Sequence, residues 1–136
     1  MKNWNDLKNN WLVAGAAFLF LAVGLGAFGA HGLEKTLSEK AITTFKTGVT
    51  YQFYHGFALL LVGVLQAFSK ISHFESSPYL KRSGLCFAGG VLLFSFNCYL
   101  YALTTVKTFA MIVPLGGLSF LLGWLFLIFA FIKRKA

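Results

Sequence analysis

Four stretches of the chain contain no Lys, Arg, Asp or Glu and are each long enough to cross a lipid bilayer. They are Asn9–Leu33, Thr47–Ser69, Ser83–Val106 and Thr108–Ile132. A membrane-spanning helix needs about 20 mostly apolar residues, because the hydrocarbon core is about 30 Å thick. Four segments of this length cannot close a barrel, so each must satisfy its backbone as a helix. We predict an all-α polytopic membrane protein with transmembrane helices over residues 11–30, 51–68, 83–103 and 109–132.

The composition also indicates a lipid environment. Of the 136 residues, 57% are hydrophobic and 12% are charged, whereas an average soluble domain is about 25% charged. A soluble protein of this length cannot bury so large an apolar surface. We expect a single membrane domain over residues 1–136, with the four helices in an antiparallel bundle joined by short loops.

The first span has some features of a signal peptide. Lys2 and Lys8 precede it, and the small residues Ala27, Gly29 and Ala30 follow its apolar part. That part is about 20 residues long, however, whereas the apolar region of a signal peptide has about 7–15. We expect a retained helix.

The segment Glu34–Thr50 has an amphipathic pattern. Its apolar face carries Leu37, Ala41, Thr44, Phe45, Gly48 and Val49, and its polar face carries Lys35, Glu39, Lys40, Thr43 and Lys46. The pattern predicts an interfacial helix over residues 36–50. The sequence leaves open whether this helix is continuous with the second transmembrane helix.

The net charge of +8 lies at the ends of the apolar stretches and forms no continuous basic face for nucleic acid. One side of the membrane would hold eight basic residues: Lys2, Lys8, Lys70, Lys81, Arg82, Lys133, Arg134 and Lys135. The other would hold four: Lys35, Lys40, Lys46 and Lys107. The positive-inside rule predicts that both termini are cytoplasmic.

Small residues predict close helix packing. The segment Gly24–Gly29 matches the dinucleotide pattern GxGxxG, but it lies at the end of a membrane helix instead of between a strand and a helix. Ala22, Gly26 and Ala30 recur every four residues, a spacing that lets helices approach. The glycines that we expect in helix packing are Gly26, Gly29, Gly116 and Gly117, and we expect Pro114 to break the fourth helix.

Polar residues in the spans suggest a candidate cluster in the outer half of the bundle, comprising His31, Gln52, His55 and Asn97. Polar groups inside membranes are costly and often functional. The alternative is that both histidines reach toward lipid headgroups and that Asn97 hydrogen-bonds to a neighbouring helix. Two histidines without a third ligand make a poor metal site. We expect no metal, no cofactor and no catalytic residue.

Several segments resemble the bacterial domain-of-unknown-function 423 family, whose eukaryotic relatives are called transmembrane protein 256. The resemblance rests on Gly26–Leu33, Tyr51–Gly56, Pro114–Gly117 and Gly123-Trp124, and it extends over essentially the whole chain. It implies four spans in a bacterial cytoplasmic membrane and no established activity. The family usually has small Gly and Ser residues where this chain has Phe96-Asn97-Cys98, so the resemblance implies no role for Asn97.

These features favour a non-enzymatic membrane protein that serves as an accessory or assembly component of a larger complex. Its partners would be the lipid bilayer and another membrane protein, and not nucleic acid. The alternative is a homo-oligomeric transporter or channel whose path runs past His31, Gln52, His55 and Asn97. A lipid-modifying enzyme is a weaker hypothesis, because no nucleophile accompanies the histidines.

Overall fold

The computed structural model describes residues 9–71 and 77–132, which form helices and contain no strand. The elements are α1 (Asn10–Phe28), a π-helical turn η2 (Gly29–Leu33), α2 (Glu39–Ile71), α3 (Pro78–Thr104) and α4 (Lys107–Ile132). Each α-helix, with η2 extending α1, is long and apolar enough to cross a membrane. The predicted all-α membrane fold is confirmed.

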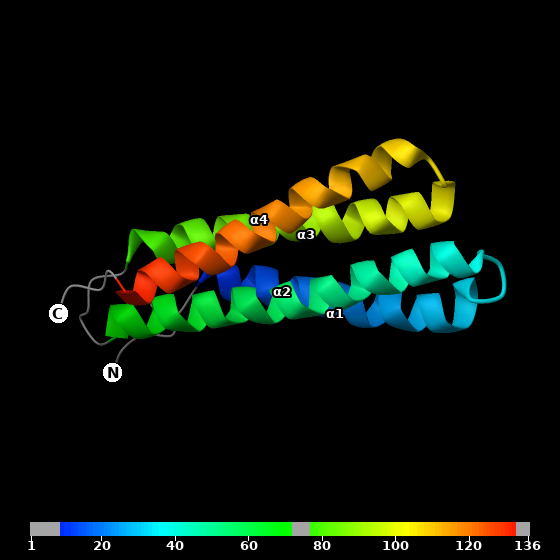
Figure 1. Ribbon diagram of the computed structural model, residues 1–136. Helices are drawn as coiled ribbons and strands as arrows, with labels where there is room; N and C mark the ends of the chain where they lie inside the picture. Colours follow the sequence, from blue (N-terminus) through cyan, green and yellow to red (C-terminus); the bar gives the residue numbers. More distant parts are fainter. Residues whose placement is uncertain (1–8, 72–76, 133–136) are drawn as a thin grey trace.

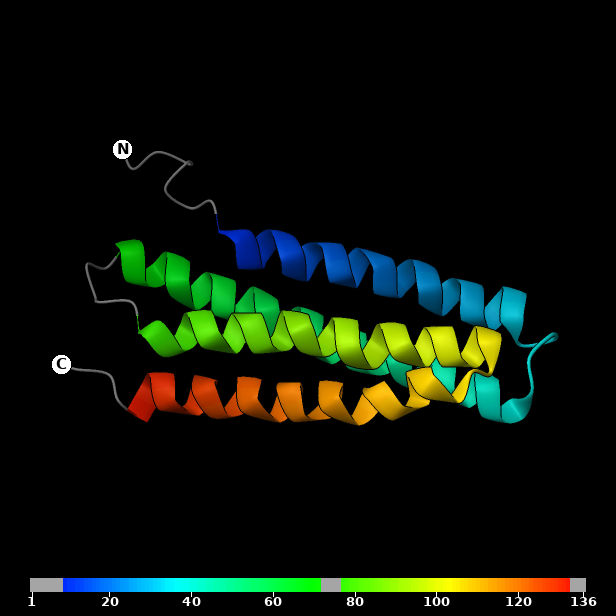
Figure 2. The same ribbon diagram turned by 90° about the horizontal axis from the view of Figure 1, so that it is seen from above.

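Helices that follow one another in the chain pack side by side in antiparallel order. α1 packs on α2, α2 on α3, and α3 on α4. Figure 1 shows α1 and α2 in one layer and α3 and α4 in the other. Seen from above, α1 and α4 lie at opposite edges, and α2 runs obliquely beneath α3 (Figure 2). We call the end with η2 and the α3–α4 connection the outer end, after the predicted topology, and the opposite end the inner end.

The amphipathic segment and the second transmembrane helix form one continuous helix, α2, of 33 residues. The separate ranges 36–50 and 51–68 of the sequence prediction are thus joined, and the helix begins at Glu39. Ala41, Ile42 and Phe45 are buried in a cluster with Tyr99 and Ala102 of α3. The apolar face of the segment therefore packs on a helix and not on the membrane surface, so the segment continues α2 in line.

Two glycines bring α1 and α2 into backbone contact. A Cβ on Gly15 would lie 2.9 Å from the carbonyl oxygen of Gly56, and one on Gly63 would lie 2.9 Å from the amide nitrogen of Leu12. Near this contact, Asn9 accepts a hydrogen bond from the Trp11 amide at 2.9 Å and caps α1. Its Nδ2 donates to the Gly63 carbonyl at 3.1 Å. Close approach and the cap together fix the inner half of α1 on α2.

The four glycines expected in helix packing differ in how tightly they are enclosed. A Cβ on Gly116 would lie 2.7 Å from the Cα of Phe94, and one on Gly29 would lie 2.9 Å from the ring of Phe45. Gly26 and Gly117 have more room, since the nearest atoms would lie at 3.4 and 4.0 Å. Gly116 is thus the one of the four that meets the backbone of another helix.

The α3–α4 contact also contains two serines that donate to carbonyls across the interface. Ser83 Oγ donates to the Gly123 carbonyl at 2.8 Å, and Ser119 Oγ donates to the Cys86 carbonyl at 2.7 Å. One bond runs in each direction between the helices. Because lipid offers no competing water, such pairs help to fix the register of α3 against α4.

The fourth helix does not break at Pro114, contrary to the sequence prediction, because Pro114 lies inside α4. Proline removes one backbone hydrogen bond. Ending the helix there would leave several more backbone groups without partners in lipid. The exposed position of Pro114 also keeps its ring out of the α3–α4 contact.

The neighbouring glycines of α4 give a matched test of this packing. Gly116→Ala would push a methyl group into the Phe94 backbone, whereas Gly117→Ala would meet the Phe94 ring at an ordinary 4.0 Å. Overpacking costs about 1–3 kcal/mol, so Gly116→Ala should lower the melting temperature in detergent and Gly117→Ala should leave it close to wild type. Equal melting temperatures for the two variants would contradict the assigned α3–α4 contact.

Candidate functional site

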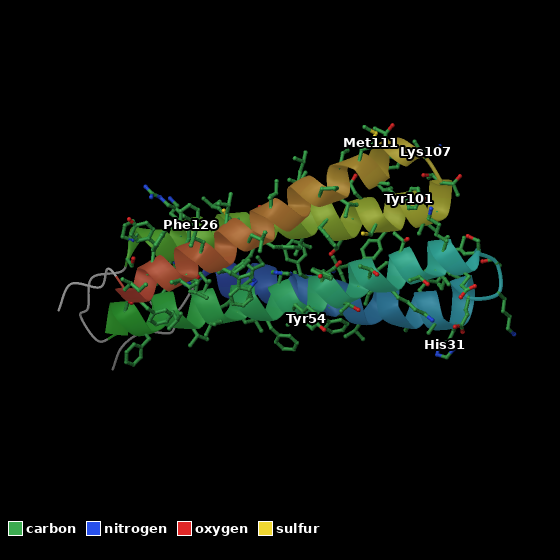
Figure 3. The ribbon with its side chains drawn as sticks, in the orientation of Figure 1. His31, Tyr54, Tyr101, Lys107, Met111 and Phe126 are labelled. Atoms are coloured by element: carbon green, nitrogen blue, oxygen red, sulfur yellow. The ribbon has the colours of Figure 1, made fainter. Side chains whose placement is uncertain are left out.

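The structure does not join the four residues of the predicted polar cluster in one hydrogen-bond network within residues 9–71 and 77–132. His31 is exposed, in η2 at the outer end, and Figure 3 shows it far along the bundle from Tyr54, the neighbour of His55. Gln52, His55 and Asn97 are buried. Within residues 9–71 and 77–132, the side chains of these three residues have no hydrogen-bond partner in common.

The position of His55 along α2 follows from where the helix begins. His55 is the middle residue of α2, because the helix begins at Glu39 and ends at Ile71. A helix of this length extends about 50 Å and exceeds the hydrocarbon core of about 30 Å at both ends. His55 therefore lies near the middle of α2 and not close to its outer end.

Gln52 is completely buried and links three helices. Its Nε2 donates to the Phe18 carbonyl of α1 at 2.8 Å. Its Oε1 accepts a hydrogen bond from the Tyr99 hydroxyl of α3, also at 2.8 Å. A carbonyl can only accept, so the bond to Phe18 fixes which end of the amide carries the nitrogen. Gln52 is therefore a structural connection between α1, α2 and α3.

Asn97 makes its hydrogen bonds within α3. Its Nδ2 donates to the carbonyls of Leu93 at 3.0 Å and Leu92 at 3.3 Å. In the part of the chain that the structure describes, its side chain has no hydrogen bond to another helix. The expected link from Asn97 to a neighbouring helix is therefore absent there.

Both ring nitrogens of His55 are engaged. Nδ1 lies 2.8 Å from the Tyr51 carbonyl, and the indole N–H of Trp124 points at Nε2 across 3.3 Å. A carbonyl requires a donor and an indole N–H requires an acceptor, so Nδ1 carries the proton and Nε2 carries the lone pair. A doubly protonated ring would place an N–H against the indole N–H. The geometry therefore selects the neutral ring and one tautomer.

Aromatic rings surround this histidine. The rings of His55 and Phe120 stack with centroids 3.4 Å apart and planes inclined by 4°. The Phe87 centroid lies 5.6 Å from that of His55 and 4.9 Å from that of Trp124. Phe120 packs against Gly90, and Phe87 packs against Gly123, where a Cβ would clash with each ring. The glycines of α3 and α4 thus make the space that brings these rings to His55.

An open groove of about 700 Å³ lies between α2 and α4 beside these rings. Its lining residues, most of them aromatic, are Tyr51, Tyr54, His55, Phe57, Phe94, Gly117, Phe120, Leu121 and Trp124. Many of them are also exposed on the bundle surface, including Tyr54 at 60% and Leu121 at 66%. We call this the aromatic groove. It opens on the side of the bundle, near the middle of α2.

A second hollow of about 340 Å³ lies between the same helices nearer the outer end. It is more polar, and its lining residues are Lys40, Thr43, Thr44, Thr47, Phe94, Cys98, Tyr101, Ala110 and Val113. We call this the outer pocket. Phe94 lines both hollows, so they adjoin at that ring.

This arrangement suits the binding of an apolar molecule better than catalysis. No three His, Cys, Asp or Glu side chains within residues 9–71 and 77–132 come close enough to hold a metal ion. The sequence assigns no site role to Trp124, Tyr99 or Phe120, although each contacts a candidate residue. Trp124 offers one clue, because an indole N–H inside a membrane span has no water to bind and needs an acceptor in the protein.

The contact between His55 and Trp124 predicts energetic coupling. In reversible unfolding in mixed micelles, His55→Phe and Trp124→Phe should each destabilise the protein, and the double variant should lose less than their sum. Contacting residues couple by about 0.5–3 kcal/mol, and hydrogen bonds in membranes average about 0.6 kcal/mol, so we expect the lower part of that range.

The control cycle combines His55→Phe with His31→Ala, and it should be additive because His31 is exposed at the outer end. Additivity in both cycles would contradict the His55–Trp124 hydrogen bond.

Comparisons with known proteins agree with the resemblance found in the sequence. The sequence model of a family described as "Protein of unknown function (DUF423)" matches residues 25–117. The chain is 37% identical over 123 residues to a UPF0382 membrane protein of Staphylococcus aureus (strain bovine RF122 / ET3-1), a match that covers 90% of this chain and 95% of the relative. It is also 37% identical over 123 residues to the UPF0382 membrane protein YwdK of Bacillus subtilis (strain 168), covering 90% and 96%. No solved structure matches the chain significantly. The chain therefore belongs to the DUF423 family of membrane proteins.

Proposed function

We propose that this chain is a non-enzymatic accessory or assembly component of a complex in a bacterial cytoplasmic membrane, and that it docks through the outward face of α1. The observation that carries the proposal is a seam of exposed residues along α1 and into η2, at alternating spacings of four and three: Val13, Ala17, Phe20, Gly24, Ala27 and His31. This spacing is typical of a helix that packs along another helix. We call it the α1 seam.

Gly24 supports the assignment of the α1 seam. No atom lies within 4 Å of a Cβ built on Gly24, so the fold of the chain does not require a glycine there. Phe20, one turn away, is 79% exposed. Small residues beside large ones allow a second membrane helix to approach closely. A partner helix would give Gly24 the close contact that it lacks within this chain.

The hydrogen bonds of the buried polar residues argue against the alternative of a homo-oligomeric transporter. Gln52 and Asn97 direct their side-chain amides to groups of this chain, and both nitrogens of His55 are engaged. Acid–base catalysis likewise needs a histidine nitrogen with access to a substrate proton. The aromatic groove opens to the side of the bundle and not along its axis, which favours lateral binding over transport.

We further propose that both termini are cytoplasmic, on the basis of the eight-to-four distribution of Lys and Arg. A reporter enzyme that is active only when exported should be inactive after fusion to Ala136. The same reporter inserted in the α3–α4 connection, between Thr105 and Val106, should be active. Activity after Ala136 and none between Thr105 and Val106 would show the opposite orientation and contradict this proposal.

The docking proposal predicts a specific protein contact at the α1 seam. A photo-crosslinking residue in place of Phe20 should form a discrete adduct with a second membrane protein in intact membranes. The same residue in place of Leu118, an exposed position of α4, should form no such adduct. Gly24→Leu should abolish the Phe20 adduct without changing the melting temperature of the purified chain, because its side chain meets open space.

The outcomes separate the hypotheses. An adduct that has twice the mass of this chain would support a homo-oligomer and contradict the accessory role. An adduct unaffected by Gly24→Leu, or none at all, would contradict docking at the α1 seam.

A further inference from the structure

The outer pocket and the aromatic groove form one continuous track along α2 and α4. On α2 the lining positions Lys40, Thr44, Thr47, Tyr51 and Tyr54 follow each other at spacings of four and three, which is one face of a helix. On α4 the positions Ala110, Val113, Gly117, Phe120 and Trp124 do the same. Phe94 of α3 lies in the floor where the two hollows meet. No residue of α1 lines the track, so it is independent of the α1 seam.

The length of the track matches one leaflet of a bilayer. Lys40 and His55 are fifteen residues apart on α2, which corresponds to about 22 Å of helical rise. Half of a bilayer, from the outer edge of the headgroup region to the midplane, measures about 20–22 Å. The track therefore runs from headgroup level at Lys40 to mid-depth at His55.

The outer end of the track is suited to an anion. Within residues 9–71 and 77–132, the outer end has four lysines and two glutamates: Lys35, Lys40, Lys46, Lys107, Glu34 and Glu39. Lys46 pairs with Glu34 at 3.0 Å, whereas Lys40 has no carboxylate within ion-pair distance in those residues. Thr43 and Tyr101, which both carry a hydroxyl group, line the same pocket. An anionic group there would meet an unpaired cation and hydroxyl donors.

The deeper part of the track is suited to a hydrocarbon chain. Its walls are aromatic and aliphatic, and His55 is turned toward Trp124 and Tyr51 by its two hydrogen bonds. Its volume of about 700 Å³ lies within the usual range of ligand sites, about 300–1,000 Å³. An apolar chain would lose no hydrogen bond on entering it.

We propose that the track binds one anionic phospholipid of the outer leaflet, with its phosphate at Lys40 and Thr43 and an acyl chain in the aromatic groove. The charge at one end, the aromatic walls at the other and the one-leaflet length together favour this occupant. A transmembrane helix from a partner, in contrast, would bury Lys40 against apolar side chains unless it supplied an acidic residue at that depth.

Native mass spectrometry of the detergent-solubilised chain tests this proposal with phosphatidylglycerol and phosphatidylcholine of identical acyl chains. The wild type should retain one phosphatidylglycerol in preference to phosphatidylcholine. Lys40→Gln should weaken phosphatidylglycerol binding about fivefold, the effect of one lysine near anionic headgroups, and Lys35→Gln should not. Lys35 is the matched control, because it is exposed at the same end and does not line the track.

A second variant tests the acyl-chain site. Gly117→Leu should fill the groove, because the nearest atom to its Cβ is 4.0 Å away, and it should weaken binding of both lipids. Equal loss in Lys40→Gln and Lys35→Gln, or equal retention of the two lipids by the wild type, would overturn the headgroup assignment. Unchanged binding in Gly117→Leu at wild-type melting temperature would overturn the chain assignment. None of these results depends on a partner at the α1 seam.

Discussion

Gln52 lies without any solvent contact at the junction of α1, α2 and α3, and the hydrocarbon of a bilayer offers an amide no water to bind. Its two hydrogen bonds, to the Phe18 carbonyl and from the Tyr99 hydroxyl, are therefore made within the protein. Leaving either end of a buried amide unpaired costs about 1–3 kcal/mol. This requirement fixes the rotation of α2 about its axis. With Gln52 turned to α1 and α3, the face that carries Lys40, Thr47 and Tyr51 is turned to the groove.

The second half of the bundle is positioned by shape more than by polarity. α3 and α4 approach at Gly116, Gly90 and Gly123, and the rings of Phe120 and Phe87 fill the spaces beside the latter two. Phe120 of α4 stacks on His55 of α2. The packing of α4 on α3 therefore also determines which ring contacts α2. The aromatic groove thus depends on packing on both of its sides. The hydrogen bonds of Gln52 fix the rotation of α2, and the glycine contacts with α3 fix the position of α4.

The four spans could be predicted because charge-free length is a sufficient criterion for crossing a membrane. The continuity of α2 across residues 50 and 51 could not be predicted, because it depends on whether Ala41 and Phe45 pack on the membrane surface or on Tyr99. The position of His55 near the middle of α2 follows from the same continuity. The acceptor of Gln52 on α1 is a backbone carbonyl, for which the sequence carries no distinguishing residue. The contrast between Gly116 and Gly117 is similarly invisible in the sequence, because it depends on the rotation of α4.

An ionisable residue at the middle of a membrane protein usually suggests proton movement. A histidine that relays protons needs one nitrogen that can exchange its partner as the charge changes. In His55 the Tyr51 carbonyl takes the proton-bearing nitrogen and the Trp124 indole takes the other. Protonation would have to break the contact with Trp124 and would leave a charge among aromatic rings in hydrocarbon. His55 is therefore better suited to join α2 to α4 as a neutral ring, and that junction forms the inner wall of the groove. The same contact that removes His55 from proton chemistry shapes the surface that a lipid chain would meet.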